Sequence, residues 1–344
     1  MKKFNELIDR HEAFLACAPV DRPLIGRWFG GYFPSYQFPQ GVASWRDGQV
    51  LQPDKVEFSQ FVEDYENLYR VHLDAKDDWF FVASAYWGIP WLEAILGCRI
   101  ESTSFTCRAE PGSDVIQHVN LDTNGWFSAL VQFTRELVAF ADGRFPVCPP
   151  LLRGPGDCLS AMIGGTEFIL GFDDNPDMMR NSLNLCVEVR MDVIRRLCSI
   201  IPAWHGTHAA GGYPSKVWCH RTVAYHQEDS AALLSPDIFR EFLLPIHKKM
   251  STVAEVNFIH LHSACLYPVD ILLDKNVYDV LEINIDHAGA GPALKDMMPV
   301  LHKIQKARKP LLLWGEFSPE DWKMILHELS PEGLSLQPIT MEKI

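Results

Sequence analysis

Two histidines in the segment 257–265, NFIHLHSAC, have a type and spacing that could support chemistry. His260 and His262 lie one residue apart at the end of an apolar run, and alternate residues of a β-strand project from the same face. Two adjacent imidazoles can supply half of a zinc site, which then needs a third ligand and an open position for substrate. Cys265 is a further candidate ligand. The alternative interpretation is a pair of hydrogen-bonded structural histidines.

Acidic and imidazole side chains also follow other strand-like runs. If those strands are parallel, their C-terminal ends meet at one edge, where such groups can bind a metal, transfer protons or orient a substrate. Helix capping is the competing explanation for acids in these positions. The residues concerned are His226, Glu228, Asp229, Asp286 and Glu316.

An unusual aromatic segment occurs near the N-terminus, RPLIGRWFGGYFPSYQF. It combines Arg27 with Trp28, Tyr32 and other aromatic residues around several glycines. An arginine among aromatic rings can hold the carboxylate or phosphate of a flat ligand. A loop packed over the end of a barrel, with Arg27 in a structural salt bridge, would give the same pattern.

The elements that position these residues alternate between strand-like and helical patterns. The last third of the chain shows this most plainly, and successive βα units of this length predict a parallel sheet. No dinucleotide-binding or P-loop glycine motif follows an early strand, which favours a closed barrel over an open nucleotide-binding sheet. We therefore expect one (β/α)8 TIM-type barrel domain over residues 1–344, with an N-terminal helical extension. The expected helices include 3–17, 126–141, 176–200, 291–307 and 318–329, and the expected strands include 256–262, 280–285 and 310–314.

Composition excludes several classes of protein. The 344 residues carry 31 Lys and Arg against 44 Asp and Glu, a formal net charge of -13 that disfavours binding to nucleic acid or an anionic membrane surface. No apolar run is long enough for a membrane span. The nine cysteines form no CxxC pair, which indicates a reducing cytoplasm more than a disulfide framework.

Several segments, taken in order, resemble the uroporphyrinogen decarboxylase superfamily, which includes the methylcobalamin:coenzyme M methyltransferases. GRWFGGYFPSY is similar to the decarboxylase signature MRQAGRYLPEY, with Arg27 on its first arginine. RGPGDCLSAMIGG, EDSAALLSPDIFREFLLPIHKKM and LLLWGEFSPEDW resemble later family segments, and NFIHLHSAC lies where the methyltransferases have H-x-C-G. The resemblance spans nearly the whole chain and implies the same barrel fold.

Departures from the family pattern argue against uroporphyrinogen decarboxylation. Gly31 stands at the second arginine of the signature, and Gly88, Ala161 and Asp229 stand at or near positions that bind substrate in the decarboxylase. The late N-x-G-H-G motif is absent. The methyltransferase branch fits better, because its first zinc histidine corresponds to His260.

The resemblance therefore implies a zinc-dependent methyltransferase. Its cysteine ligand is replaced by His262 and its late cysteine has no counterpart, so Glu316 or Asp286 would complete the zinc site. A methylated corrinoid, carried by a corrinoid protein as partner, would donate the methyl group to a thiol or related small nucleophile.

Individual roles follow from that hypothesis. Arg27 would hold an anionic end of the acceptor, and Asp229 and Glu228 would act in catalysis by orienting the acceptor or an imidazole. The substrate-binding residues would be Arg27, Trp28, Tyr32, His226 and Asp286. The alternatives are a metal-free decarboxylase or lyase of a small or tetrapyrrole carboxylate, a metal hydrolase, and a barrel that binds a corrinoid or tetrapyrrole without turnover.

Overall fold

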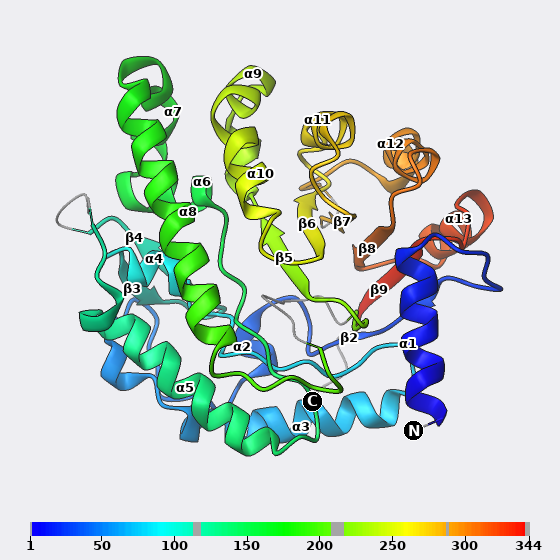
Figure 1. The fold of residues 1–344 in the computed structure, drawn as a ribbon, viewed down its shortest axis with the longest axis horizontal. Helices are drawn as coiled ribbons and strands as arrows, with labels where there is room; N and C mark the ends of the chain where they lie inside the picture. The colour runs from blue at the N-terminus through cyan, green and yellow to red at the C-terminus, as the bar shows by residue number, and fades with distance from the viewer. Residues whose placement is uncertain (1, 113–117, 208–216, 287–288, 341–344) are drawn as a thin grey trace.

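Parallel β-strands run through the centre of the molecule and helices surround them (Figure 1). The computed structural model describes residues 2–112, 118–207, 217–286 and 289–340. Seven strands form one sheet in the order β1-β9-β8-β7-β6-β5, and β2 also pairs with β9. These strands are β1 (Leu24–Ile25), β2 (Trp28–Phe29), β5 (Val223–Gln227), β6 (Val256–His262), β7 (Val280–Ile285), β8 (Leu311–Gly315) and β9 (Leu334–Thr340).

Short extended segments continue this arrangement beyond β1. The Asp78 amide donates to the Ile25 carbonyl over 2.9 Å, and Ala83 forms an isolated parallel bridge with Val147. The expected α/β fold with parallel strands is confirmed. Within the described residues, the continuous strand ladder covers seven strands and does not close into a complete ring.

The helices lie outside the strands and connect them. Within the described residues they are α1 (Lys2–Leu15), α2 (Pro34–Gln37), α3 (Val62–Ala75), α4 (Trp91–Ile95), α5 (Gly125–Ala141), α6 (Pro155–Ile163), α7 (Gly165–Asp174), α8 (Pro176–Cys198), α9 (Pro236–Ile238), α10 (Leu244–Met250), α11 (Tyr267–Lys275), α12 (Leu294–Lys306) and α13 (Pro319–Glu328). A separate antiparallel hairpin joins β3 (Arg99–Ser102) and β4 (Cys107–Glu110). None of the described helices is long and apolar enough to cross a membrane.

Local sequence explains where several helices begin. Asn175 caps α8 by accepting a hydrogen bond from the Met178 amide, and the Ser318 hydroxyl accepts one from the Asp321 amide in the capping box of α13.

The long helical pattern after Ser235 is interrupted by a π-helical turn, η5 (Phe239–Leu243), just before Pro245. Proline has no amide hydrogen to donate, so a regular α-helical ladder cannot pass unbroken through this position.

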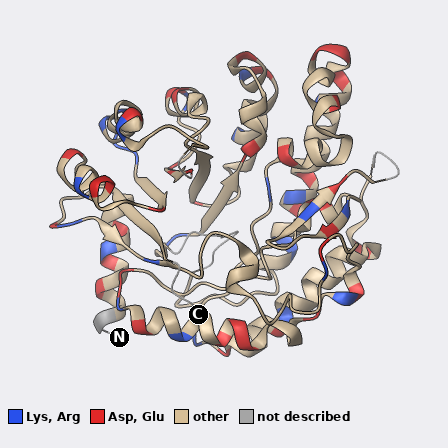
Figure 2. Cartoon of the chain, turned by 180° about the vertical axis from the view of Figure 1, so that it is seen from behind, with Lys and Arg blue, Asp and Glu red and all other residues tan. Residues whose placement is uncertain are grey.

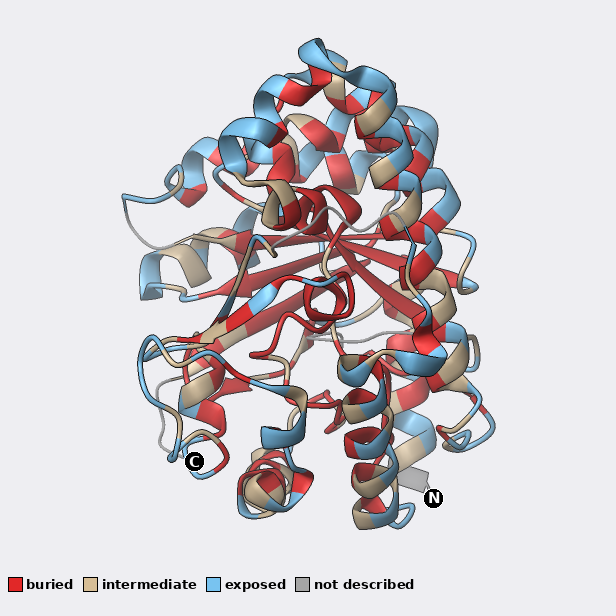
Figure 3. Ribbon diagram, turned by 90° about the vertical axis from the view of Figure 1, so that its left-hand side faces the viewer, coloured by how far each residue is buried: buried red, intermediate tan, exposed pale blue. Residues whose placement is uncertain are grey.

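Alternation along the strands separates two apolar layers. Val256 and Phe258 of β6 belong to the cluster inside the barrel, whereas Ile259 and Leu261 pack with the surrounding helices. Figure 3 shows the strands buried and the helices exposed on their outer faces. Charged residues lie mainly on those helices (Figure 2). Because side chains alternate, His260 and His262 face the same side as Val256 and Phe258, toward the barrel interior.

Candidate functional site

His260 and His262 at the end of β6 direct their Nε2 atoms toward one another, 3.3 Å apart. The outer nitrogen of each ring contacts a carboxyl group: His260 Nδ1 lies 2.5 Å from Oε1 of Glu282 on the neighbouring strand β7, and His262 Nδ1 lies 2.5 Å from Oδ1 of Asp286, the residue that follows β7. The pairing of β6 with β7 produces this arrangement, because His260 is in register with Glu282. Both rings therefore have their Nδ1 atoms occupied and their Nε2 atoms facing a common point.

Asp229 completes a group of three potential ligands. It begins the 3-10 turn η4 (Asp229–Leu233), which Glu228 separates from β5, and its Oδ1 lies 3.7 Å from His262 Nε2. The ligand atoms of Asp229, His260 and His262 all lie within 4.8 Å of one another. The Gln227 side-chain amide donates to the other Asp229 oxygen. Two imidazoles and one carboxylate are a donor set that binds Zn²⁺ at catalytic sites.

The spacing of the nitrogen atoms fits such an ion. Two Zn–N bonds of about 2.0–2.1 Å at a tetrahedral angle place the nitrogens about 3.3–3.4 Å apart, close to the observed 3.3 Å. Carboxylates that accept the outer N–H of ligating histidines fix the tautomer that leaves Nε2 for the metal. Glu282 and Asp286 occupy those positions. The residues present therefore fit a divalent cation.

The electrostatics of the group also favour a cation. Burial lowers the pKa of His260 to about 4, with the neighbouring His262 acting in the same direction. Burial raises the pKa of Glu282 well above its usual value. Burial alone would also raise the pKa of Asp286. Hydrogen bonds from His262, the Ser263 hydroxyl and the Ala264 amide outweigh that effect and hold the pKa below the usual range. A positive ion bound to both Nε2 atoms would offset the free-energy cost of burying charge on Glu282 and Asp286.

Acid should weaken zinc binding at this site. Burial alone would lower the pKa of His262, but the Asp286 hydrogen bond and the Asp229 charge raise it above the usual value. A protonated Nε2 cannot bind zinc, so affinity is full above this pKa and falls about tenfold per pH unit below it. We expect the apparent Kd for zinc to rise between pH 8 and pH 6. Competition with a chelator at each pH measures this, and Asp286→Asn should move the onset to lower pH. A Kd independent of pH would contradict the assignment.

Two cavities share Asp229 and His262. One, of about 230 Å³, is also lined by His260, Arg153 and several aromatic side chains. The other, of about 220 Å³, lies beside Asp286, and its lining includes four alanines, Leu261 and Cys265. The candidate ligands thus stand at a wall common to both spaces.

The predicted residues Tyr32 and Asp286 both reach this region, and Asp286 lines the smaller cavity as well as contacting His262. Tyr32 lines the larger cavity, where its ring stacks on Trp314 with centroids 5.3 Å apart. Its hydroxyl accepts a hydrogen bond from Asn284 over 2.5 Å. Burial raises the pKa of Tyr32 to about 12, which keeps the phenol protonated.

Arg27 and Trp28 have different surroundings from those expected. Arg27 donates to the Ala75 carbonyl over 2.7 Å and lies beside Asp77, and it lines neither cavity. Trp28 is buried, and its indole N–H donates to the Gly31 carbonyl. The cation in the larger cavity is Arg153, which the sequence did not single out.

His226 and Glu228 have mainly supporting contacts. His226 alternates with Tyr225 and Gln227, which line the cavity, so its ring faces away and contacts Asn257 Oδ1 over 3.0 Å. Glu228 is buried at one edge of the smaller cavity and accepts hydrogen bonds from the Ser230 hydroxyl and the Asp157 amide. These bonds hold the turn that carries Asp229.

Glu316 does not belong to the group of three potential ligands. It is an exposed residue after β8 and is not in the group formed by Asp229, His260 and His262. The structure therefore brings Asp229, rather than Glu316, to the histidine pair.

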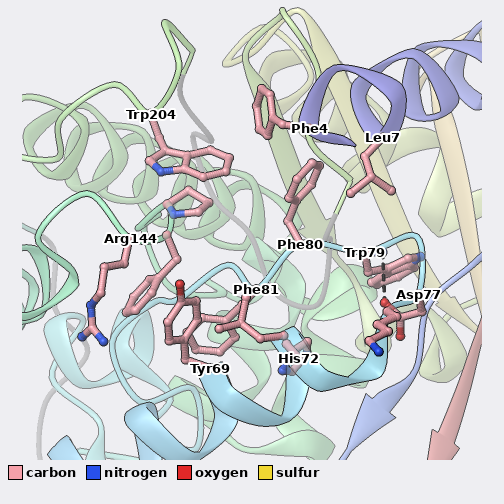
Figure 4. Close-up of a pocket in the computed structure, with 14 residues that line it drawn as sticks. Phe4, Leu7, Tyr69, His72, Asp77, Trp79, Phe80, Phe81, Arg144 and Trp204 are labelled. Atoms are coloured by element: carbon pink, nitrogen blue, oxygen red, sulfur yellow. Dashed lines mark hydrogen bonds between the residues drawn. The ribbon is translucent and has the colours of Figure 1, made fainter. Parts of the chain in front are cut away.

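A separate cavity of about 260 Å³ lies near the N-terminal ends of the strands (Figure 4). Figure 4 shows aromatic side chains including Phe4, Phe80 and Trp204 around it. Two of its charged groups are already paired, Arg144 with Glu66 and Asp77 with Arg27. Active sites of parallel barrels lie at the opposite end of the strands, where the histidines are found.

Comparison with known proteins supports the fold. No protein-family model matches the chain, and no curated protein matches it significantly. A methyltransferase from Methanosarcina mazei superposes with a TM-score of 0.62 at 16% identity, covering 98% of this chain and 94% of that one. A B12-independent methionine synthase from Shewanella sp. W3-18-1 gives 0.48 at 10% identity, covering 89% and 92%, a similarity too weak to support an argument. The predicted resemblance to the methyltransferase branch is thus confirmed at the level of the fold, which this chain shares with the Methanosarcina enzyme.

Proposed function

We propose that this protein is a zinc-dependent methyltransferase-like enzyme that moves a methyl group from a methylated corrinoid, or a similar donor, to a thiol or related small nucleophile. One observation carries the proposal: two Nε2 atoms 3.3 Å apart, each ring backed by a carboxylate, with Asp229 beside them. The fold shared with a methyltransferase supports the choice of reaction. A corrinoid protein is the proposed partner.

Asp229, His260 and His262 would hold the zinc ion. Bound zinc lowers the pKa of a proton-bearing nucleophile and so keeps it as a reactive anion at neutral pH. Glu282 and Asp286 orient the two imidazoles, and the Ser263 hydroxyl and Ala264 amide fix Asp286 in turn. Such supporting contacts keep the ligands in one geometry.

The two cavities suit a reaction between two molecules. They meet at Asp229 and His262, so a nucleophile in one space and a methyl group presented from the other can approach the same point. Each volume is smaller than that of a typical drug-sized ligand site. Neither space is large enough to enclose a whole tetrapyrrole, so we expect a corrinoid to present only its methyl group. This size also disfavours the decarboxylation of a tetrapyrrole inside the barrel.

The test is methyl transfer from methylcobalamin. Zinc-loaded protein with a panel of small thiols should consume methylcobalamin, as followed by absorbance, and form S-methyl products detected by mass spectrometry. Chelator-treated protein should react at least about 100-fold more slowly, because a Lewis acid contributes several kcal/mol to such a step. Equal rates with and without zinc would contradict the proposal. Release of CO₂ from a small carboxylate by metal-free protein would favour a lyase instead.

A further inference from the structure

We infer that the larger cavity binds a single-ring aromatic carboxylate carrying a hydroxyl group, with the ring between aromatic walls and the carboxylate on Arg153. The inference rests on the proposed function, whose methyl acceptor it specifies. In the transfer, the hydroxyl loses its proton to solvent and its oxygen bonds to the methyl carbon. The bond from that carbon to the donor breaks, and both electrons stay on the donor.

The walls of the cavity favour a flat ring. Tyr32, Phe33, Trp87, Tyr225 and Trp314 all line it. Aromatic rings gain from stacked and edge-to-face contacts beyond the burial of their area. A cavity of about 150 Å³ is enough to hold benzene, so about 230 Å³ accommodates one substituted ring.

Arg153 supplies the positive charge. It is the only Lys or Arg among the described residues lining this cavity. Its Nε lies 3.5 Å from the buried Glu93, and its side chain, 39% exposed, makes no hydrogen bond to another described residue. The planar guanidinium suits a carboxylate because it can donate two parallel hydrogen bonds.

Binding to 4-hydroxybenzoate tests the inference without any catalytic assay. Quenching of tryptophan fluorescence and isothermal titration calorimetry should both detect binding, since Trp87 and Trp314 line the cavity. Cyclohexanecarboxylate, which keeps the charge but not the flat ring, and phenol, which lacks the carboxylate, should each bind at least tenfold more weakly. Equal binding of cyclohexanecarboxylate, or binding of 3-mercaptopropionate but not 4-hydroxybenzoate, would overturn the inference.

Variants identify the contacts. Arg153→Gln should weaken binding about 10- to 100-fold, as expected for loss of charged hydrogen bonds. Because Arg153→Gln leaves Glu93 without its cation, the Glu93→Gln/Arg153→Gln double variant repeats the test with neither charge present. Arg144→Gln, in the far cavity, is the matched control and should leave the affinity unchanged.

Failure of this inference is distinguishable from failure of the proposed function. Arg153 is not in the ligand group, so Arg153→Gln should keep the zinc content of the wild type. Zinc-dependent transfer to an aliphatic thiol with no binding of 4-hydroxybenzoate would overturn the inference and preserve the function. Binding that Arg153→Gln abolishes, in a protein that transfers no methyl group, would support the cavity assignment and overturn the function.

Discussion

The His260→Ala/His262→Ala double variant will bind zinc more than about 100-fold more weakly than the wild type. Removal of a residue that merely supports a metal ligand costs about 10- to 100-fold in affinity, so removal of two ligands must exceed that range. After dialysis against a weak chelator, elemental analysis should find one zinc per wild-type chain and none in the variant. The Nε2 atoms 3.3 Å apart are the basis for this expectation.

Controls separate ligand loss from unfolding. His302 and His327 are exposed on α12 and α13, so the His302→Ala/His327→Ala variant carries the same two substitutions away from the site and should retain zinc. His260→Ala leaves the buried Glu282 carboxyl without its ring partner and can destabilise the fold. The single variant His262→Ala, at a side chain 30% exposed, avoids that problem. Stoichiometric zinc in a folded double variant would remove the proposed mechanism.

Asp229→Asn will weaken zinc binding by at least about tenfold, whereas Glu316→Gln will change the affinity by less than about twofold. Asparagine keeps the size of the side chain and removes the negative charge, and a neutral amide oxygen is a poorer partner for Zn²⁺ than a carboxylate. Asp229 lies within the ligand group, and Glu316 does not. The two substitutions are matched, because each replaces one exposed acid by its amide.

Cobalt substitution gives this comparison a second readout. The visible absorption of bound Co²⁺ depends on the number and type of its ligands, so Asp229→Asn should alter the spectrum and Glu316→Gln should leave it unchanged. The reverse result would show that the segment after β8 supplies the third ligand. No change in either variant would mean that the histidines bind zinc without a carboxylate ligand from these two positions.

Alternation along strands made the centre of the site predictable. The i, i+2 spacing of His260 and His262 placed both rings on one face, and the structure brings them together. The same rule applied to LEINID would have placed Glu282, Asn284 and Asp286 beside them, but the sequence interpretation used only the last of the three. Alternation along β5 would also have predicted that the His226 side chain points away from the cavity, because its neighbours Tyr225 and Gln227 face the cavity.

Contacts between distant segments could not be predicted in this way. Arg153 reaches the cavity from the segment before α6, and its sequence context of Gly and Pro gives no sign of that position. Arg27 instead meets the end of α3, a contact between segments about 50 residues apart. The last strand, β9, was also missed, because Ser335 and Gln337 face the interior and break the apolar pattern of a buried strand.

The common wall formed by Asp229 and His262 has a kinetic consequence. If the proposed function holds, each reactant would have its own space, both would be present at once, and no side chain would have to carry the methyl group between half-reactions. Turnover should then pass through a ternary complex, so double-reciprocal plots at several concentrations of the second substrate should give intersecting lines rather than the parallel lines of a ping-pong scheme.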